Sequence, residues 1–382
     1  MKNFKKHLCQ SGLKSLSVPI CVLLLTSAII CATIFVSCKP EPKTIKIGAI
    51  LPLTGKAAWL GENARNGIQL AVDELNRKGG IKGTKIEVIF EDSKLDPKEG
   101  VAIANRLIDI EKVRALIVNG TTIVNAILPI TEQKGILLFA QTIHPGITEK
   151  GKNIFRIYGG GDYEWQMLAQ YINNQNYNIG IFHINAQYGL DSKAMLKKYL
   201  ASKIKVVFEE SYEIGATDFR ALISKSKNKA VDAVVLMGYG NEFIALIKQM
   251  KELGFNKKIL GNIDFTFDFL VKAPECQGAI FVAPAFSIGK LTATGQTFEK
   301  NYMLKFNKKP SWDVANSYET IMILAKVIEK VGTWNLEKIK ESLLEIKDYE
   351  GISGKLTIAA NRDAIFDLYI ATLKDNNIVE LR

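Results

Sequence analysis

Apolar strand-like runs alternate with longer helix-like segments along most of this chain, and this alternation limits the possible folds more than any other feature. The run at 45–53 predicts a buried strand, and the segment at 63–80 predicts a helix that stops at Gly79 and Gly80. The same order continues with strands at 85–93, 113–120 and 135–140 and with helices at 98–112 and from about Thr122. Strands that alternate with helices predict an α/β fold in which a mostly parallel sheet is covered by helices.

The strand-helix unit recurs after residue 161, which predicts two similar lobes. The further strands are expected near 177–184, 205–211, 230–238, 257–262 and 278–284. The Gly159–Gly161 run follows a strand predicted at 153–158, and we interpret it as a hinge, with a simple surface loop as the alternative. A helix at 317–332 and terminal strands within 354–381 suggest that the chain returns to each lobe. The expected lobes are 44–161 plus about 287–345, and 162–286 plus about 346–382.

The first 37 residues have the layout of a secretory signal. Residues 1–14 carry four lysines and no acid, and residues 15–37 carry no charge. The segment before Cys38 resembles a bacterial lipobox, with Phe35 where Leu is usual. We therefore predict that 1–37 is a signal peptide, that Cys38 carries a lipid anchor, and that 38–43 tethers a domain in the periplasm or on the cell surface. The alternative is an uncleaved membrane anchor, because about 20 apolar residues suffice to span a bilayer.

Charge and composition exclude several classes of function. Without the signal the formal net charge falls from +11 to +7, because that segment carries four lysines and no acid. The surplus is dispersed and no nucleic-acid motif accompanies it, so we expect no nucleic-acid partner. Cys276 is the only cysteine beyond Cys38 and cannot form an internal disulfide. Three histidines in the whole chain disfavour a His-based metal site and a hydrolytic triad, and we predict no metal.

No nucleotide or nucleophile motif is complete. The segment at 48–57 resembles a phosphate loop, but Ile50 stands in place of the first Gly and Ala57 in place of Ser or Thr. Neither a G-x-G-x-x-G fingerprint nor a G-x-S-x-G nucleophile elbow occurs. The sequence therefore predicts no cofactor.

Polar side chains follow two neighbouring strands of the first predicted lobe. Thr121 and Thr122 come after one strand and open a helix, so two hydroxyls and a helix N-terminus suit a carboxylate or another anion. Helix capping is the alternative, and capping needs only one hydroxyl. Gln141 and Thr142 follow the next strand and are expected beside the first loop.

Aromatic residues occupy matching positions in the second predicted lobe. Tyr188 and Tyr239 each come just after a strand, where they are suited to cover an apolar or zwitterionic ligand. Ordinary packing within the lobe is the alternative for each tyrosine alone.

Several segments resemble the solute-binding proteins of branched-chain amino-acid ABC transporters, which have the type 1 periplasmic-binding fold. The likeness covers nearly all of residues 44–382. Its most specific segments are 47–83, 90–108, 187–191, 217–227 and 238–254. The resemblance implies two similar lobes, each a mostly parallel sheet flanked by helices, which are joined by a multi-strand hinge and close on a small ligand.

The resemblance also implies a set of ligand contacts from both lobes. They are the α-carboxylate loop with Thr121 and Thr122, the neighbouring loop with Gln141 and Thr142, the aromatics Tyr188 and Tyr239, an ammonium-binding acid at Asp264, and a side-chain pocket wall at Trp59 and Leu60. The chain departs from the family at Ile143, where Ser or Thr is common. That departure bears on the contact with the ligand's head group.

We therefore expect a lipid-anchored solute-binding protein of an ABC importer, and not an enzyme. It would capture an amino acid or a related amide or carboxylate as a monomer and deliver it to a permease. The alternative is a ligand-binding sensor subunit that signals to a membrane receptor.

Overall fold

The computed structural model describes residues 44–381 apart from Lys56, Ile143, Pro145, Gly160, Tyr239 and Ser353. The predictions for the signal peptide, for Cys38 and its tether, and for Ile143 and Tyr239 lie outside the described residues. Among the helices of the described part, none is both long enough and apolar enough to cross a membrane.

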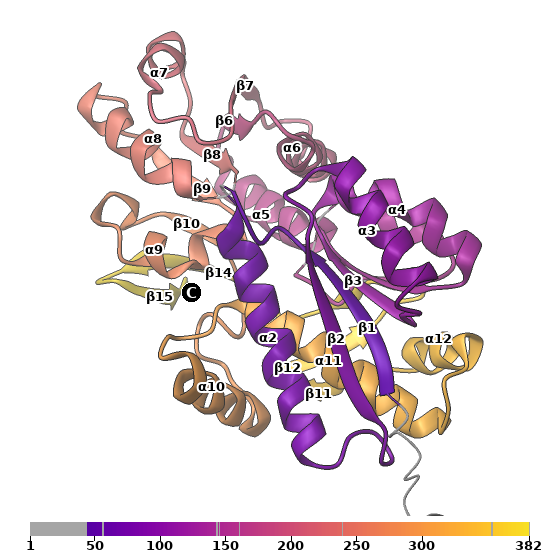
Figure 1. Ribbon diagram of the computed structural model, residues 1–382. Coiled ribbons are helices and arrows are strands. Elements are labelled where there is room, and N and C mark those ends of the chain that lie inside the picture. The colour runs from indigo at the N-terminus through magenta and orange to yellow at the C-terminus, as the bar shows by residue number, and fades with distance from the viewer. Residues whose placement is uncertain are drawn as a thin grey trace, which may run out of the picture. The chain divides into compact units, whose positions relative to one another are not determined.

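The first sheet is fully parallel, in the order β2-β1-β3-β4-β5 (Figure 1). Its strands are β1 (Thr44–Leu51), β2 (Lys85–Asp92), β3 (Ala115–Asn119), β4 (Leu137–Gln141) and β5 (Ile154–Phe155). The connecting helices are α2 (Ala58–Arg77), α3 (Pro97–Asp109) and α4 (Thr121–Lys134), and the short turn η1 (Ile147–Lys150) precedes β5. Strands β3 and β4 are buried along their whole length, as expected for a parallel sheet covered on both faces.

The second sheet has the order β15-β14-β10-β9-β8-β6-β7. Its parallel strands are β6 (Ile179–Ile184), β7 (Val206–Tyr212), β8 (Ala233–Met237), β9 (Lys258–Gly261) and β10 (Ile280–Pro284). Its helices are α5 (Gly161–Gln175), α6 (Gln187–Tyr199), α7 (Arg220–Ser226), α8 (Asn241–Glu252) and α9 (Asp268–Val271), with the short turns η2 (Ile263–Thr266) and η3 (Pro274–Cys276). The hairpin of β14 (Leu368–Lys374) and β15 (Asn377–Glu380) adds to β10 in antiparallel fashion. The predicted α/β fold with two mostly parallel sheets is confirmed.

After β10 the chain returns to the first sheet. The returning elements are α10 (Ala293–Phe306), α11 (Trp312–Val331), α12 (Leu336–Leu344) and a small antiparallel sheet of β11 (Tyr349–Gly351), β12 (Gly354–Ile358) and β13 (Ala364–Ile365). Helix α11 packs along α2, and Tyr318 Oη donates a hydrogen bond to Glu74 at 2.7 Å. Ile352 and Leu356 belong to the same core as β1 and α2. The change of core thus falls between β13 and β14, which differs from the predicted lobe boundary near residue 346.

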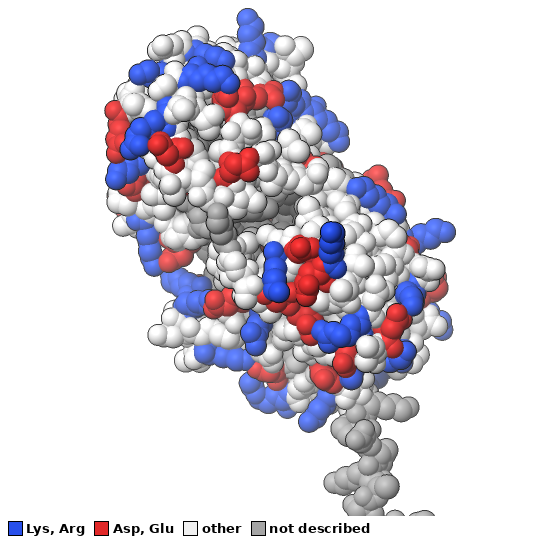
Figure 2. All heavy atoms as spheres, turned by 45° about the horizontal axis from the view of Figure 1, so that its top comes forward, with Lys and Arg blue, Asp and Glu red and all other residues white. Residues whose placement is uncertain are grey.

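Helices cover both faces of each sheet. In Figure 1, α3 and α4 lie together on one side of the first sheet, and α2 lies on the other with α11. Helices α5 and α6 bury apolar side chains against one face of the second sheet, and α7 and α8 against the other. On the face drawn in Figure 2, basic and acidic side chains are interspersed, as the dispersed charge of the sequence predicts.

Candidate ligand-binding site

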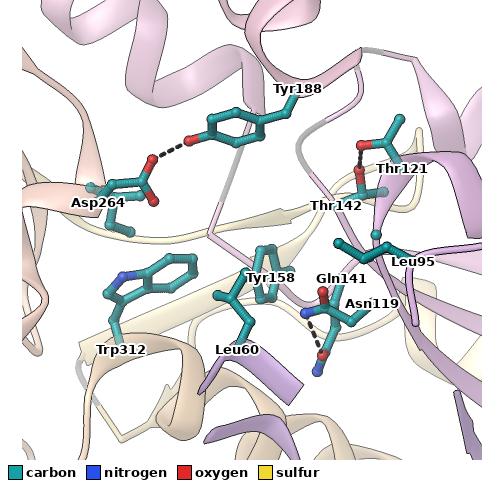
Figure 3. Close-up of a pocket in the computed structure, with 12 residues that line it drawn as sticks. Leu60, Leu95, Asn119, Thr121, Gln141, Thr142, Tyr158, Tyr188, Asp264 and Trp312 are labelled. Atoms are coloured by element: carbon teal, nitrogen blue, oxygen red, sulfur yellow. Dashed lines mark hydrogen bonds between the residues drawn. The ribbon is translucent and has the colours of Figure 1, made fainter. Parts of the chain in front are cut away.

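A pocket lies where the carboxyl ends of β3 and β4 face η2 and the start of α6 (Figure 3). It encloses about 560 Å³ of atom-free space, including solvent at its mouth, which is within the range of small-molecule sites. Its lining comes from elements of both sheets and consists of Leu60, Leu95, Asn119, Gly120, Thr121, Gln141, Thr142, Tyr158, Tyr188, Ile263, Asp264 and Trp312. Carboxyl ends of parallel strands are where open α/β sheets bind ligands.

One end of the pocket presents two hydroxyl groups at a helix N-terminus. Thr121 is the first residue of α4, and its side chain is hydrogen-bonded to that of Thr142, which follows β4. Gly120 precedes α4 with φ of 104°, a conformation that glycine adopts without strain. The first N–H groups of a helix have no partner within the helix, and the helix dipole favours negative charge there. This hydroxyl pole is suited to an anion.

Amide side chains support the hydroxyl pole. Asn119 Nδ2 donates to Gln141 Oε1 at 3.4 Å, and Gln141 Nε2 donates to Ser317 Oγ on α11 at 2.9 Å. The predicted contact Gln141 therefore lies in the lining, but both ends of its amide are bonded within the protein. Such a network fixes the ends of β3 and β4 relative to α11.

The opposite end of the pocket presents an acid. Asp264 in η2 is 7% exposed and accepts a hydrogen bond from Tyr188 Oη, which itself accepts one from Asn262 Nδ2 at 2.9 Å. Burial raises the pKa of Asp264 to about 7; the charge of Asp313 adds to the rise, and the hydrogen bonds from Tyr188 and Asn262 oppose it. Burial and the charge of Asp264 also hold the pKa of Tyr188 well above its usual value, so its hydroxyl remains a donor. This acid pole is suited to a cation.

Aromatic and aliphatic side chains form the wall between the two poles. The rings of Tyr158 and Trp312 pack with centroids 4.9 Å apart. A Cβ atom built on Gly159 would lie 2.8 Å from the Trp312 ring, so close packing requires glycine at this position. Leu60 and Ile263 complete the wall. The wall is apolar, and within the described residues no Lys or Arg lines the pocket.

The structure brings together most of the site residues predicted from the sequence. Thr121, Gln141, Thr142, Tyr188 and Asp264 all line the pocket. Thr122 is exposed and lies outside the lining. Trp59 also lies outside it, because its ring packs against Phe267 with centroids 4.4 Å apart, and its neighbour Leu60 lines the pocket instead.

Sequence reasoning missed Asn119, Tyr158 and Trp312. Asn119 ends a strand and Tyr158 follows one, so only their place at the carboxyl end of the sheet could have indicated them. Trp312 comes from a helix some 190 positions after β3, and nothing in its neighbourhood marks it. Among the residues the structure describes, no group of three His, Cys, Asp or Glu side chains could hold a metal ion.

A hydrogen-bonded pair beside the pocket joins the loop after β4 to α6. His144 Nδ1 lies 2.6 Å from Asp191 Oδ2, and the two side chains are only 14% and 9% exposed. Lys150 Nζ lies 2.6 Å from His144 Nε2. Because an ammonium group only donates, Nε2 is the acceptor, and the ring proton on Nδ1 is donated to Asp191. The pair therefore connects the loop of Thr142 with the helix of Tyr188.

Comparisons with known proteins agree with this architecture. The chain matches the periplasmic binding protein family over residues 44–377. The leucine-, isoleucine-, valine-, threonine-, and alanine-binding protein of Pseudomonas aeruginosa is 30% identical over 329 residues, which are 81% of this chain and 84% of that protein.

Two solved structures show the same fold. The branched-chain amino-acid transporter substrate-binding protein LivJ of Streptococcus pneumoniae, in complex with isoleucine, is 27% identical with a TM-score of 0.78. The leucine-binding protein LivK of Thermotoga maritima is 25% identical with a TM-score of 0.81. Each likeness covers 88% of this chain and 98% of the other. The chain therefore belongs to the periplasmic binding protein family, as a solute-binding relative of the branched-chain amino-acid-binding proteins of ABC transporters and not as an enzyme.

Proposed function

We propose that the protein captures an α-amino acid with an uncharged side chain between its two lobes and delivers it to the permease of an ABC importer. The observation that carries the proposal is that two opposite poles face each other across one pocket. The hydroxyls of Thr121 and Thr142 lie at one end and the carboxyl group of Asp264 at the other (Figure 3). A zwitterion needs both poles, whereas a simple carboxylate needs only the first.

The hydroxyl pole suits the ligand's carboxylate. Burying a carboxylate costs several kcal/mol or more unless hydrogen-bond donors replace its water. The Thr121 and Thr142 hydroxyls and the N-terminus of α4 supply such donors. Hydrogen bonds to a charged group stabilise more than those between neutral groups.

The acid pole suits the ligand's ammonium group. An ammonium beside Asp264 favours the ionised carboxylate and forms a charge-assisted hydrogen bond with it. The apolar wall offers no charged partner to the ligand's side chain, so an aliphatic side chain fits best. The names of the related proteins, which bind leucine, isoleucine and valine, support branched-chain amino acids as the first candidates.

Leucine and its one-pole analogues test this proposal. The protein is unfolded and refolded to remove carried ligand, then titrated calorimetrically with leucine, 4-methyl-2-oxopentanoate, which lacks the ammonium, and isopentylamine, which lacks the carboxylate. We expect micromolar affinity for leucine, about 8 kcal/mol, and a loss of about tenfold to hundredfold for each analogue. If the keto acid binds as tightly as leucine, the acid pole does not bind the ligand's ammonium group.

We further propose that residues 1–37 are a signal peptide and that Cys38 is lipidated. The support is the basic and then uncharged N-terminus that ends at Cys38. Cells fed radiolabelled palmitate should label the wild type but not the Cys38→Ser variant, and the label should lie in the membrane fraction. Equal labelling of both proteins would contradict the anchor.

Delivery to a permease is tested by uptake. Loss of the gene should lower uptake of labelled leucine, and the wild-type gene should restore it. Unchanged uptake would separate ligand binding from transport and favour a sensor.

A further inference from the structure

A second buried carboxyl group lies next to the acid pole. Glu164 in the first turn of α5 has no exposed surface, and neither of its carboxyl oxygens accepts a hydrogen bond of normal geometry from the described residues, although the N–H of Ile263 lies near it. The side chain of Asn262 adjoins it, and the Oδ1 atom of Asn262 likewise has no partner in that part of the chain. Buried polar groups are nearly always paired. The Glu164 carboxyl and Asn262 Oδ1 are neighbouring acceptors without a well-aligned donor, which indicates that the carboxyl group carries a proton.

A chain of hydrogen bonds leads from this position into the pocket. Asn262 Nδ2 donates to Tyr188 Oη at 2.9 Å, and Tyr188 Oη donates to Asp264. If Glu164 donates to Asn262 Oδ1, every bond in this chain points toward Asp264. The amide of Asn262 is then held in one orientation, and both Asp264 and Tyr188 are fixed in turn.

We propose that Glu164 is a positioning residue of the acid pole. It stays protonated, donates a hydrogen bond to Asn262 Oδ1 and thereby holds Tyr188 and Asp264 in place for the ligand's ammonium group. This inference rests on the proposed function. Glu164 itself does not line the pocket, so it acts through the three residues between it and the ligand.

The surroundings of Glu164 favour its neutral form. Burial raises the pKa of Glu164 to about 8, the charge of Asp264 adds to the rise, and Asn262, the N–H of Ile263 and the charge of Arg156 oppose it. Arg156 is itself paired with Asp363 at 2.8 Å. The other titratable groups nearby are Tyr158 and Tyr188, whose hydroxyls stay protonated because burial holds their pKa values well above the usual range.

The two acids thus share one negative charge. Like charges at close range disfavour double ionisation. A bound ammonium favours ionised Asp264, and ionised Asp264 in turn keeps Glu164 protonated. A single charge at this pole matches a single ammonium group.

Two substitutions in the full-length protein separate these roles. Glu164→Gln keeps a neutral donor of the same size, whereas Glu164→Leu keeps the volume and removes the donor. Leucine affinity is measured by calorimetry from pH 6.5 to 8.5. We expect the Gln variant to bind as the wild type does at pH 7, and the Leu variant to bind about tenfold more weakly. Glu319→Gln is the matched control, because Glu319 is also buried but lies in α11 away from the lining.

An infrared spectrum of the ligand-free protein gives a second readout. The C=O stretch of a protonated carboxylic acid should be present at pH 7 and should be diminished by Glu164→Gln. This readout does not depend on leucine binding or on the Leu variant. If the wild type bound no amino acid, the proposed function would fail, and the infrared band would still decide the protonation of Glu164.

Three results would overturn the inference. The Gln variant could lose as much affinity as Asp264→Asn, which would make Glu164 a charged ligand contact. The Leu variant could keep wild-type affinity, which would remove its positioning role. The band of the protonated acid could be the same in the wild type and in Glu164→Gln, which would show that Glu164 is ionised.

Discussion

Asp264 titrates close to neutral pH, since burial raises its pKa to about 7. An ammonium ligand prefers the ionised carboxylate. Below pH 7 the free protein holds a proton at this pole, and binding must expel it. Above pH 7 the carboxylate is already ionised. Affinity for an amino acid is therefore expected to rise with pH and then to level off.

The first prediction concerns this pH dependence. From pH 5.5 to about 7, leucine affinity should rise by up to tenfold per pH unit and then change little, because one proton is released on binding below the pKa. Calorimetry in buffers of different ionisation enthalpy measures both the affinity and the released proton. Asp264→Asn should bind weakly at every pH. Asp268→Asn, an exposed acid paired with Lys272, should keep the wild-type profile. A flat wild-type profile would contradict the prediction.

The second prediction concerns two adjacent threonines. Thr121→Ala removes a buried hydroxyl from the lining and should weaken leucine binding about tenfold, because one donor to the carboxylate is lost. Thr122→Ala changes an exposed side chain outside the lining and should leave affinity unchanged. The two single variants are compared by calorimetry after thermal unfolding shows that both fold. If both variants lost the same amount of leucine affinity, Thr121 would not be the threonine that distinguishes the hydroxyl pole, and the prediction would be wrong.

For single residues, the sequence predicted well which loops form the candidate site. It predicted less well which side chains of those loops enter the pocket. Thr121 and Thr142 could be predicted because they follow strands at the edge where parallel sheets bind ligands, whereas Asp264 was implied only by the family resemblance. Trp59 and Leu60 are neighbours on one helix, and a shift of one residue rotates a side chain by about 100°. Resemblance therefore predicted the right turn of α2, while packing against Phe267 decided which residue faces away from the pocket.

Helix α6 links the site to the other lobe. It carries Tyr188 at the pocket and Asp191 three residues later, and residues three apart lie on the same face of a helix. Asp191 is paired with His144, two residues beyond Thr142. Because both side chains are largely buried, this hydrogen bond to a carboxylate is screened less than a contact on the surface. This contact should stabilise the arrangement in which both poles face the ligand.

The third prediction follows from that contact. Asp191→Asn should raise the dissociation rate of leucine about tenfold, because the buried His144 loses its charged partner, while association changes little. Stopped-flow tryptophan fluorescence measures both rates. Asp218→Asn disrupts an exposed pair with Arg220 and is the control. An unchanged dissociation rate would show that the His144–Asp191 pair does not hold the ligand-bound arrangement.

Elements were predictable where burial is continuous and less so elsewhere. The strands of both mostly parallel sheets were found because β3, β4, β6 and β8 are mostly apolar and are buried along their whole length. Helix α11 begins at Trp312, five residues before the predicted start, because its first turn carries Asp313 and Asn316 and lacks a clear apolar period. That early start is the reason that Trp312 was missed. The short strands β11 to β13 give too weak a pattern to be predicted one by one.

At the scale of the whole molecule, an aromatic contact joins α2 to the segment that carries Asp264. Trp59 packs against Phe267 and Phe269, with ring centroids 4.4 and 5.8 Å apart. The rings of Phe267 and Phe269 stack at 6.0 Å, and Phe267 also lies 6.2 Å from Trp312. Such contacts stabilise the arrangement in which α2 lies against the segment that carries Asp264.

The fourth prediction tests this contact. Phe269→Ala should weaken leucine binding about threefold to tenfold. The aromatic pair of Phe269 with Trp59 stabilises the arrangement in which the lobes are closed, and the variant loses this pair. Small-angle X-ray scattering should show a larger radius of gyration for the ligand-free variant than for the wild type. Leu304→Ala, an exposed position on α10, is the control. Equal affinity and equal radius would contradict a role in closure.

The pairing of α2 with α11 also has a consequence for how the chain is made. Asn63 Nδ2 donates to Asp313 across 250 positions of sequence, and the core of the first lobe contains side chains from both helices. A growing chain cannot close that core until α11 has left the ribosome, so most of the polypeptide is synthesised before the first lobe can fold. A protein that works outside the cytoplasm benefits from this delay, because a chain that is still unfolded when it reaches the membrane can be translocated across it.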